Sequence, residues 1–236
     1  MNIHSEFKLP ALSNWQKRIY LNWAKQILES QQLMTHEGTN ILHYTLEKKK
    51  IFERMSHYPR GDRIDHSTGA QYFYHCHREN YESTEHGHFH CFLRYKHIPK
   101  SIKPARIADW DRYMDNPMTH IIAIGMNQFG QPIRLFTVNR WVTSEIWYHS
   151  EYSHRLIRRY KMTLNDHSYW QVLDRWVEGM IHLFKPQILW LHQQRDKRII
   201  QHQEDNHIDN PLMDYDLEEL SDIPIDLKQQ IEWVIS

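Results

Sequence analysis

The feature that most constrains the fold is a set of histidines that alternate with other residues in two short, neighbouring segments. In a β-strand, residues i and i+2 point to the same face of the sheet. The alternation therefore predicts two strands, joined by a hairpin loop over residues 79–85. On the second strand the intervening residues Phe89, Cys91 and Leu93 would form the opposite, apolar face. The histidines are His75, His77, His86, His88 and His90.

Pairing of these strands with their histidine faces aligned would gather up to five imidazoles on one patch of sheet. Imidazole binds Zn, Fe, Cu and Ni, and His-x-His on one strand presents two donors to one ion. A catalytic ion needs about three protein ligands and an open position for water or substrate. Glu82 or Glu85 would complete a set of two histidines and one carboxylate, or would serve as a general base. We therefore predict a metal-dependent enzyme with the five histidines as candidate ligands and Glu82 and Glu85 as candidate catalytic groups.

The same pattern has other interpretations. The histidines would be ordinary polar side chains if they lined the solvent-exposed face of an antiparallel sheet. A shift of one residue in the strand register would place the two histidine sets on opposite faces. A closed set of ligands would serve metal storage or sensing without catalysis, and a structural or interaction domain would bind no metal. The substrate, the metal and the oligomeric state stay open at this point.

A second group of polar residues lies in the segment N-R-W-V-T-S-E, directly after a predicted strand that ends at Val138. Arg140 has a planar guanidinium that can clamp a carboxylate or a phosphate. We predict that Asn139, Arg140 and Glu145 bind the substrate, which would be a small molecule or a peptide. In the structural alternative, Arg140 pairs with Glu145 or with carbonyl groups of the loop.

The apolar periodicity around the histidine segments predicts an α+β fold. An antiparallel sheet of at least four strands should span about residues 69–138. Helical periodicity precedes the sheet over residues 14–54 and follows it over residues 150–203. The chain is expected to form a single domain over residues 1–236.

Two segments lack a clear helical or strand pattern. The segment H-Y-P-R-G-D, residues 57–62, contains Pro59 and Gly61 and is expected to be a loop. Residues 204–236 are expected to be an acidic tail that is exposed or loosely packed up to residue 222 and ends in a short helix, in which Trp233 can dock on the body.

The charge balance does not favour a nucleic acid or an anionic membrane as the partner. The chain carries 29 Lys and Arg residues and 29 Asp and Glu residues, so its net charge is zero with histidine neutral. We interpret the basic run Arg155, Arg158, Arg159 and Lys161 as a solvated helix face. No stretch is long enough to span a membrane, and the first residues do not resemble a signal peptide. The two cysteines fit reduced thiols, so we expect a cytoplasmic protein.

The segments Y-H-C-H-R, E-H-G-H-F-H and N-R-W-V-T-S-E resemble an uncharacterised family of bacterial proteins, a domain of unknown function. The resemblance extends from about residue 55 to the terminal I-D-L-x-x-Q-I segment. It implies a soluble bacterial protein and no particular activity.

Part of the chain is also similar to the first motif of the cupins, a Gly, His-x-His, Glu and Gly pattern that begins here at Gly69. The similarity implies that His75, His77 and Glu82 bind one metal ion. The next glycine, Gly87, follows Glu82 after four residues where the motif has six, and no second cupin motif is found.

Residues 86–92, H-G-H-F-H-C-F, are similar to the His-φ-His-φ-His-φ-φ motif of the histidine-triad nucleotide hydrolases, where φ is apolar. Only Gly87 departs from that pattern. The similarity implies that His88 is a nucleophile that attacks a phosphorus atom.

Overall fold

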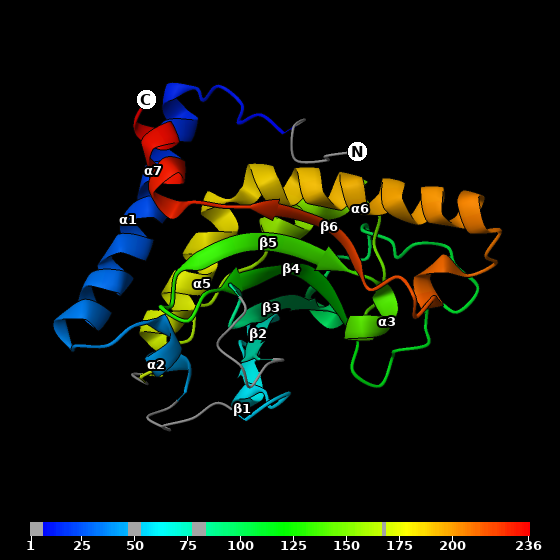
Figure 1. Ribbon diagram of the computed structural model, residues 1–236, viewed down its shortest axis with the longest axis horizontal. Helices are drawn as coiled ribbons and strands as arrows, with labels where there is room; N and C mark the ends of the chain where they lie inside the picture. Colours follow the sequence, from blue (N-terminus) through cyan, green and yellow to red (C-terminus); the bar gives the residue numbers. More distant parts are fainter. Residues whose placement is uncertain (1–6, 47–52, 77–83, 167–168) are drawn as a thin grey trace.

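The computed structural model describes residues 7–46, 53–76, 84–166 and 169–236. Within these residues the centre of the molecule is a six-stranded antiparallel sheet (Figure 1). Each strand pairs with the next one in the sequence, so the order across the sheet is the chain order. The strands are β1 (Tyr58–Ile64), β2 (Ala70–His75), β3 (Gly87–Arg94), β4 (Met118–Met126), β5 (Pro132–Val138) and β6 (Glu219–Pro224).

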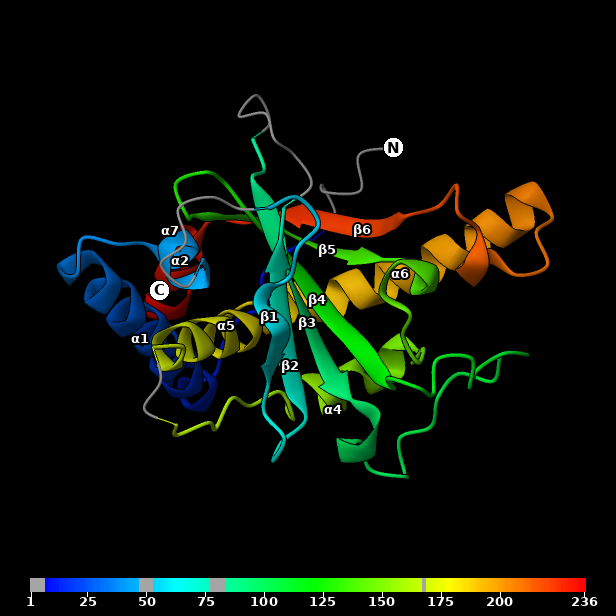
Figure 2. The ribbon, with the colours of Figure 1, turned by 90° about the horizontal axis from the view of Figure 1, so that it is seen from below.

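Two long helices lie against one face of this sheet. Seen from below, β1 to β4 lie in front of α5 and α6, which leaves the opposite face of these strands towards the viewer (Figure 2). α1 packs against α5 and α7. The helices are α1 (Asn14–His36), α2 (Ile41–Thr45), α3 (Arg140–Thr143), α4 (Ser153–Ile157), α5 (Gln171–Leu183), α6 (Lys185–Asn206) and α7 (Leu227–Ile235). Short 3₁₀ helices are η2 (Tyr95–His97), η3 (Ser150–Tyr152) and η4 (Pro211–Met213).

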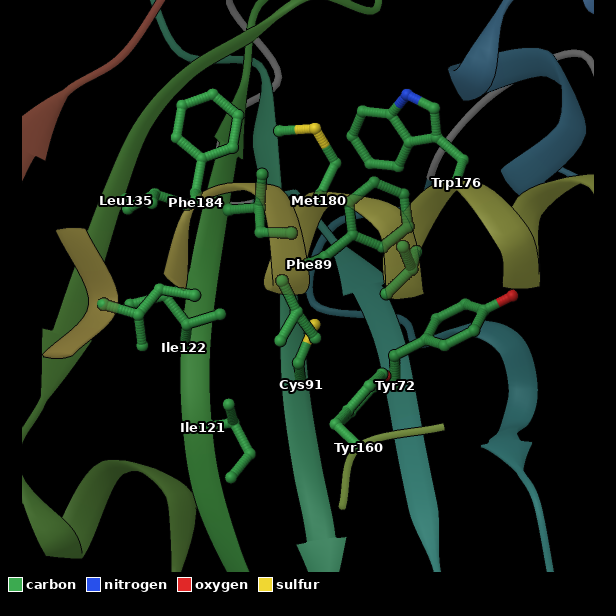
Figure 3. Close-up of a cluster of buried hydrophobic side chains, with 14 of the residues drawn as sticks. Tyr72, Phe89, Cys91, Ile121, Ile122, Leu135, Tyr160, Trp176, Met180 and Phe184 are labelled. Atoms are coloured by element: carbon green, nitrogen blue, oxygen red, sulfur yellow. The ribbon is translucent and has the colours of Figure 1, made fainter. Parts of the chain in front are cut away.

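The main apolar core lies between the sheet and the helices (Figure 3). Phe89 and Cys91 of β3 are fully buried on the face that meets α5, and the Phe89 ring lies 5.8 Å from the Trp176 ring. Burying a large apolar side chain contributes roughly 1.5–3 kcal/mol, so this layer holds α5 firmly on the sheet. Because side chains alternate along a strand, His88 and His90 must lie on the other face.

The predicted α+β fold is confirmed. β2 to β5 form the sheet expected over residues 69–138, with helices before and after it. The helical prediction over residues 14–54 is confirmed for α1 and α2, which ends at Thr45, while residues 47–52 lie outside the described residues. A capping box at Ser13, whose hydroxyl accepts a hydrogen bond from the Gln16 N–H, fixes the start of α1. None of the helices in the described part of the chain is long and apolar enough to cross a membrane.

The predicted loop over residues 57–62 is wrong, because residues 58–64 form the edge strand β1. The pairing of β1 with β2 is irregular between Tyr58 and Arg63. Pro59 and Gly61 lie in this irregular part, and proline is tolerated on edge strands and at bulges. The residues that indicate a loop are therefore compatible with this strand.

The prediction of an exposed or loosely packed segment over residues 204–222 fits residues 204–210, none of which is buried, but it is wrong for the end of the segment. Residues 219–224 form β6, which pairs with β5 at the other edge of the sheet. Leu217 and Leu220 are buried, each with 5% of its surface exposed. The short terminal helix is confirmed as α7, where the Trp233 Nε1–H donates a hydrogen bond to the Pro10 carbonyl over 3.0 Å.

Candidate metal centre

The pairing of β2 with β3 brings three of the predicted histidines together. His75 lies directly opposite His88, and Phe73 lies opposite His90, so these side chains share the sheet face that points away from α5. The exposed fractions of His75, His88 and His90 are 8%, 7% and 3%. The alternative of a solvent-exposed histidine face is therefore wrong for these three residues.

The three imidazoles are close enough to hold one ion. One ring nitrogen from each lies within 4.8 Å of the others. His75 Nε2 and His88 Nε2 are 2.8 Å apart, a hydrogen-bond distance. Two nitrogens bound tetrahedrally at about 2.0–2.1 Å from a zinc ion lie roughly 3.3 Å apart, so a separation of about half an ångström more would admit the ion. Three protein ligands leave a fourth position for water or substrate.

A carboxylate orients one of these histidines. The Glu85 Oε1 atom is 2.9 Å from His88 Nδ1, and the Arg134 Nε–H donates to Glu85 Oε2. Burial raises the pKa of Glu85, but the hydrogen bonds from His88 and Arg134 outweigh it and hold this pKa below its ordinary value. An ionised carboxylate only accepts hydrogen bonds, so His88 Nδ1 carries a proton and Nε2 keeps its lone pair when the ring is neutral. This is the carboxylate–histidine arrangement that orients metal-binding imidazoles.

The histidines lie in the wall of a cavity of about 950 Å³. Across the sheet, His90 stands in one row between Phe73 and Ala123, and the row continues to Phe136. The Arg134 guanidinium carbon lies 4.0 Å from the centre of the Phe136 ring. The volume is at the upper end of the range for small-molecule sites. The lining combines apolar side chains with the histidines, charged groups and the polar side chains of Thr84, Asn116 and Thr143.

Two glycines allow the backbone and side chains to approach closely beside the histidines. A Cβ atom on Gly87 would lie 2.4 Å from the His75 carbonyl oxygen, which is backbone and cannot yield. A Cβ atom on Gly125 would lie 2.6 Å from Glu85 Oε2 and 2.8 Å from Arg134 Cγ. Glycine at these positions therefore preserves the His75–His88 pair and the position of the Glu85 carboxylate.

One comparison with known proteins identifies the family. The model of the family described as Domain of unknown function (DUF6969) matches residues 21–225, which include all six strands and the three histidines. The chain belongs to this family. The predicted relationship to an uncharacterised family is thus confirmed, and in this DUF6969 chain the match begins within α1. Comparisons with curated proteins and with solved structures gave no match.

The other predicted ligands of this DUF6969 chain are placed differently. His77 and Glu82 lie outside the described residues. His86 precedes β3, and its Nδ1 atom is 2.7 Å from the Tyr74 hydroxyl. Among the described residues it is therefore not one of the three convergent imidazoles. The single open sheet also differs from the double-sheet jelly roll of the cupins.

The predicted substrate-binding residues are buried in the protein. Asn139, Arg140 and Glu145 each have 0% of their surface exposed. The Asn139 amide donates to two backbone carbonyls, and Arg140 donates to the Asp109 carboxylate and to the backbone carbonyl of Glu145. Glu145 accepts hydrogen bonds from the His120 N–H and the Thr119 hydroxyl. These contacts match the structural alternative, in which Arg140 binds loop carbonyl groups.

Sequence reasoning missed two histidines beside the centre. His57 stacks on Phe73 with ring centres 3.6 Å apart, and its Nδ1 atom is 2.9 Å from Asp62 Oδ1. No alternation marks it, because it lies just before the irregular strand β1. His120 Nε2 lies 3.1 Å from His90 Nδ1. A register shift between β3 and β4 hides its relation to the histidine face.

Proposed function

We propose that the protein is a metal-dependent enzyme whose ion is held by His75, His88 and His90. The observation that carries the proposal is the convergence of three buried imidazoles in the wall of a large cavity. Imidazole ligands suit Zn, Fe, Cu and Ni, and we take Zn²⁺ as the reference ion because three histidines and an open position form a known catalytic zinc set. The buried free thiols of Cys76 and Cys91 support a reducing compartment, which we propose to be the cytoplasm.

The ion would polarise a water molecule or a substrate oxygen at its open position. In this proposal Glu85 positions His88 and is not itself the general base, since its oxygens already bind His88 and Arg134. His57 fits the role of base better. Its Nδ1–H is held by Asp62, so Nε2 is the atom that would accept a proton, and the His57 ring centre lies 5.9 Å from that of His75. The Asp62 carboxylate is itself fixed by the Gln71 amide over 2.6 Å.

The cavity supports a small molecule or a short peptide segment as the substrate. Phe73 and Phe136 offer apolar contact, while Arg134 and Glu219 place one charge of each sign at the rim. The guanidinium of Arg134 is shared by two carboxylates, since it also donates to Glu219 over 2.8 Å. Among the described lining residues Arg134 is outnumbered by four carboxylates, those of Asp62, Glu85, Glu218 and Glu219, so we propose a substrate that carries no negative charge.

Cobalt substitution tests this proposal and separates catalysis from storage. Protein purified without a histidine tag should take up about one equivalent of Co²⁺, and the double variant His88→Ala with His90→Ala should take up none. The matched control is His36→Ala with His149→Ala, which removes two exposed or half-exposed imidazoles outside the centre. Azide should change the visible spectrum of the cobalt protein if a position is open to ligands. An unchanged spectrum would favour a closed, non-catalytic metal site, and no uptake at all would favour an interaction domain.

A further inference from the structure

We infer that a second ligand site, for a phosphate-bearing small molecule, lies at the end of β2 remote from the metal centre. The site is a cavity of about 500 Å³ between the β1–β2 turn, residues 65–69, and residues 155–161 at the end of α4. Among the described residues its lining is wholly polar and includes no acid. The lining side chains are Ser67, Thr68, His97, Arg155, Arg158, Arg159 and Lys161.

The cations of this cavity are not held in close ion pairs by the described part of the protein, although the charge of Lys161 acts on the Glu178 carboxylate. Arg158, Arg159 and Lys161 form no ion pair with a described carboxylate, and Arg155 donates to the Ser101 hydroxyl over 2.8 Å. The positive charge of these residues affects the pKa of a neighbouring lysine. Burial, followed by the charge of Arg158, lowers the pKa of Lys185. An anion in the cavity would therefore relieve repulsion among several cations.

The two walls of the cavity are held in place before any ligand binds. Thr68 donates through its hydroxyl to the Lys161 carbonyl over 2.6 Å. The buried Asp65 carboxylate accepts hydrogen bonds from the Ser67 N–H and hydroxyl on one wall. On the other wall it accepts them from the Thr163 N–H and hydroxyl. Asp65 is thus occupied within the protein, and a ligand would meet a preformed site with little ordering cost.

The chemistry of the lining favours a phosphate group. Guanidinium groups bind phosphate oxygens through paired hydrogen bonds, and a lysine ammonium and hydroxyl groups complement them. The volume lies within the range of small-molecule sites, about 300–1,000 Å³, so it admits a group attached to the phosphate. His97 Nε2 is buried and has no hydrogen-bond partner among the described residues, so it offers a further polar contact. Because the cations converge on one cavity in a chain with no net charge, a small ligand fits better than a nucleic acid.

This site is separate from the metal centre. Ala70 and His75 mark the two ends of β2, and five residue steps of about 3.3 Å place them roughly 17 Å apart. A ligand bound beside Thr68 would not reach the histidines. The inference is therefore independent of the proposed enzymatic function.

Calorimetric titration at constant ionic strength tests the site, with inorganic phosphate, adenosine 5′-monophosphate and adenosine as probes. We expect the monophosphate to bind at least about tenfold more tightly than adenosine, since hydrogen bonds between charged groups are the strong ones. The double variant Arg158→Gln with Arg159→Gln should weaken that binding by at least about tenfold. The matched control is Arg18→Gln with Arg198→Gln, two exposed arginines on α1 and α6 whose loss should leave the affinity unchanged.

Each other outcome overturns the inference. One is that neither inorganic phosphate nor the monophosphate binds at millimolar concentration. Another is that both double variants lose affinity equally, which would indicate a general charge effect. If a single-stranded oligonucleotide binds with a steep salt dependence while the small phosphates do not, the basic residues form a nucleic-acid surface instead. The thermal unfolding temperatures of both double variants should equal that of the parent. This control excludes unfolding of a variant as the reason for weaker binding.

Discussion

Replacing Glu85 by glutamine should weaken metal binding without removing a ligand. Glu85 Oε1 accepts the hydrogen bond from His88 Nδ1 over 2.9 Å, so its negative charge would lie across one imidazole from the proposed ion. In Glu85→Gln the amide oxygen can still accept that bond, but the charge is lost and the amide NH₂ faces the Arg134 donor. Loss of such a carboxylate typically costs 10- to 100-fold in metal affinity, which is about 1.4–2.7 kcal/mol.

The assay is a competition titration of Zn²⁺ between the protein and a chromophoric chelator at pH 7.5. The matched control is Glu219→Gln, because Glu219 accepts hydrogen bonds from the same arginine, Arg134, but has no described bond to a histidine. We expect the control to bind Zn²⁺ within about threefold of the parent. Equal losses in both variants, or no loss in Glu85→Gln, would refute the assignment of Glu85 to the orientation of His88.

Three further predictions concern stability. Burial raises the pKa of Asp65, but hydrogen bonds from Ser67 and Thr163 outweigh it and lower the pKa to about 2. Asp65→Asn should therefore lower the free energy of unfolding by on the order of 2 kcal/mol at pH 7. In denaturant titrations this difference from the parent should disappear as the pH falls towards 2. Burial raises the pKa of Glu145 to about 7. The folded protein therefore retains a proton that the unfolded chain loses, and its stability falls as the pH rises from about 4.5 to 7. Glutamine cannot ionise, so the stability of Glu145→Gln relative to the parent should be greater at pH 8 than at pH 5, as measured by urea titration. Gly87→Ala should lower stability by about 1–3 kcal/mol and weaken zinc binding, because the new Cβ meets the His75 carbonyl at 2.4 Å; thermal unfolding and zinc titration would both show it.

The sequence predicts the central strands well and the edge strands poorly. Alternating histidines and apolar residues mark β2 and β3 because these strands have two chemically distinct faces. β1 contains Pro59 and Gly61, which normally break a strand, and it is tolerated only through its irregular pairing at an edge. β6, with the sequence E-L-S-D-I-P, lies in an acidic stretch whose composition resembles a loop. Its place is set by pairing with β5, which local sequence does not encode.

The candidate site follows the same division. His75, His88 and His90 are predictable because their alternation and the hairpin bring them to one face. The pairs His57–Asp62 and His90–His120 are not, since they depend on an irregular strand and on a register shift. Arg140 has the chemistry of a substrate clamp in the sequence, yet its guanidinium binds Asp109 and backbone carbonyls in the fold. Residue type alone does not distinguish a buried structural arginine from one that faces a ligand.

An anomalous difference map at the zinc absorption edge tests the central claim most directly. We expect crystals of the protein grown with Zn²⁺ to show one strong peak bounded by His75, His88 and His90, about 2.0–2.1 Å from a ring nitrogen of each. A fourth ligand at the peak that comes from solvent would further support an open position. The account would be contradicted if the zinc peak lay elsewhere and His75 Nε2 and His88 Nε2 were still 2.8 Å apart.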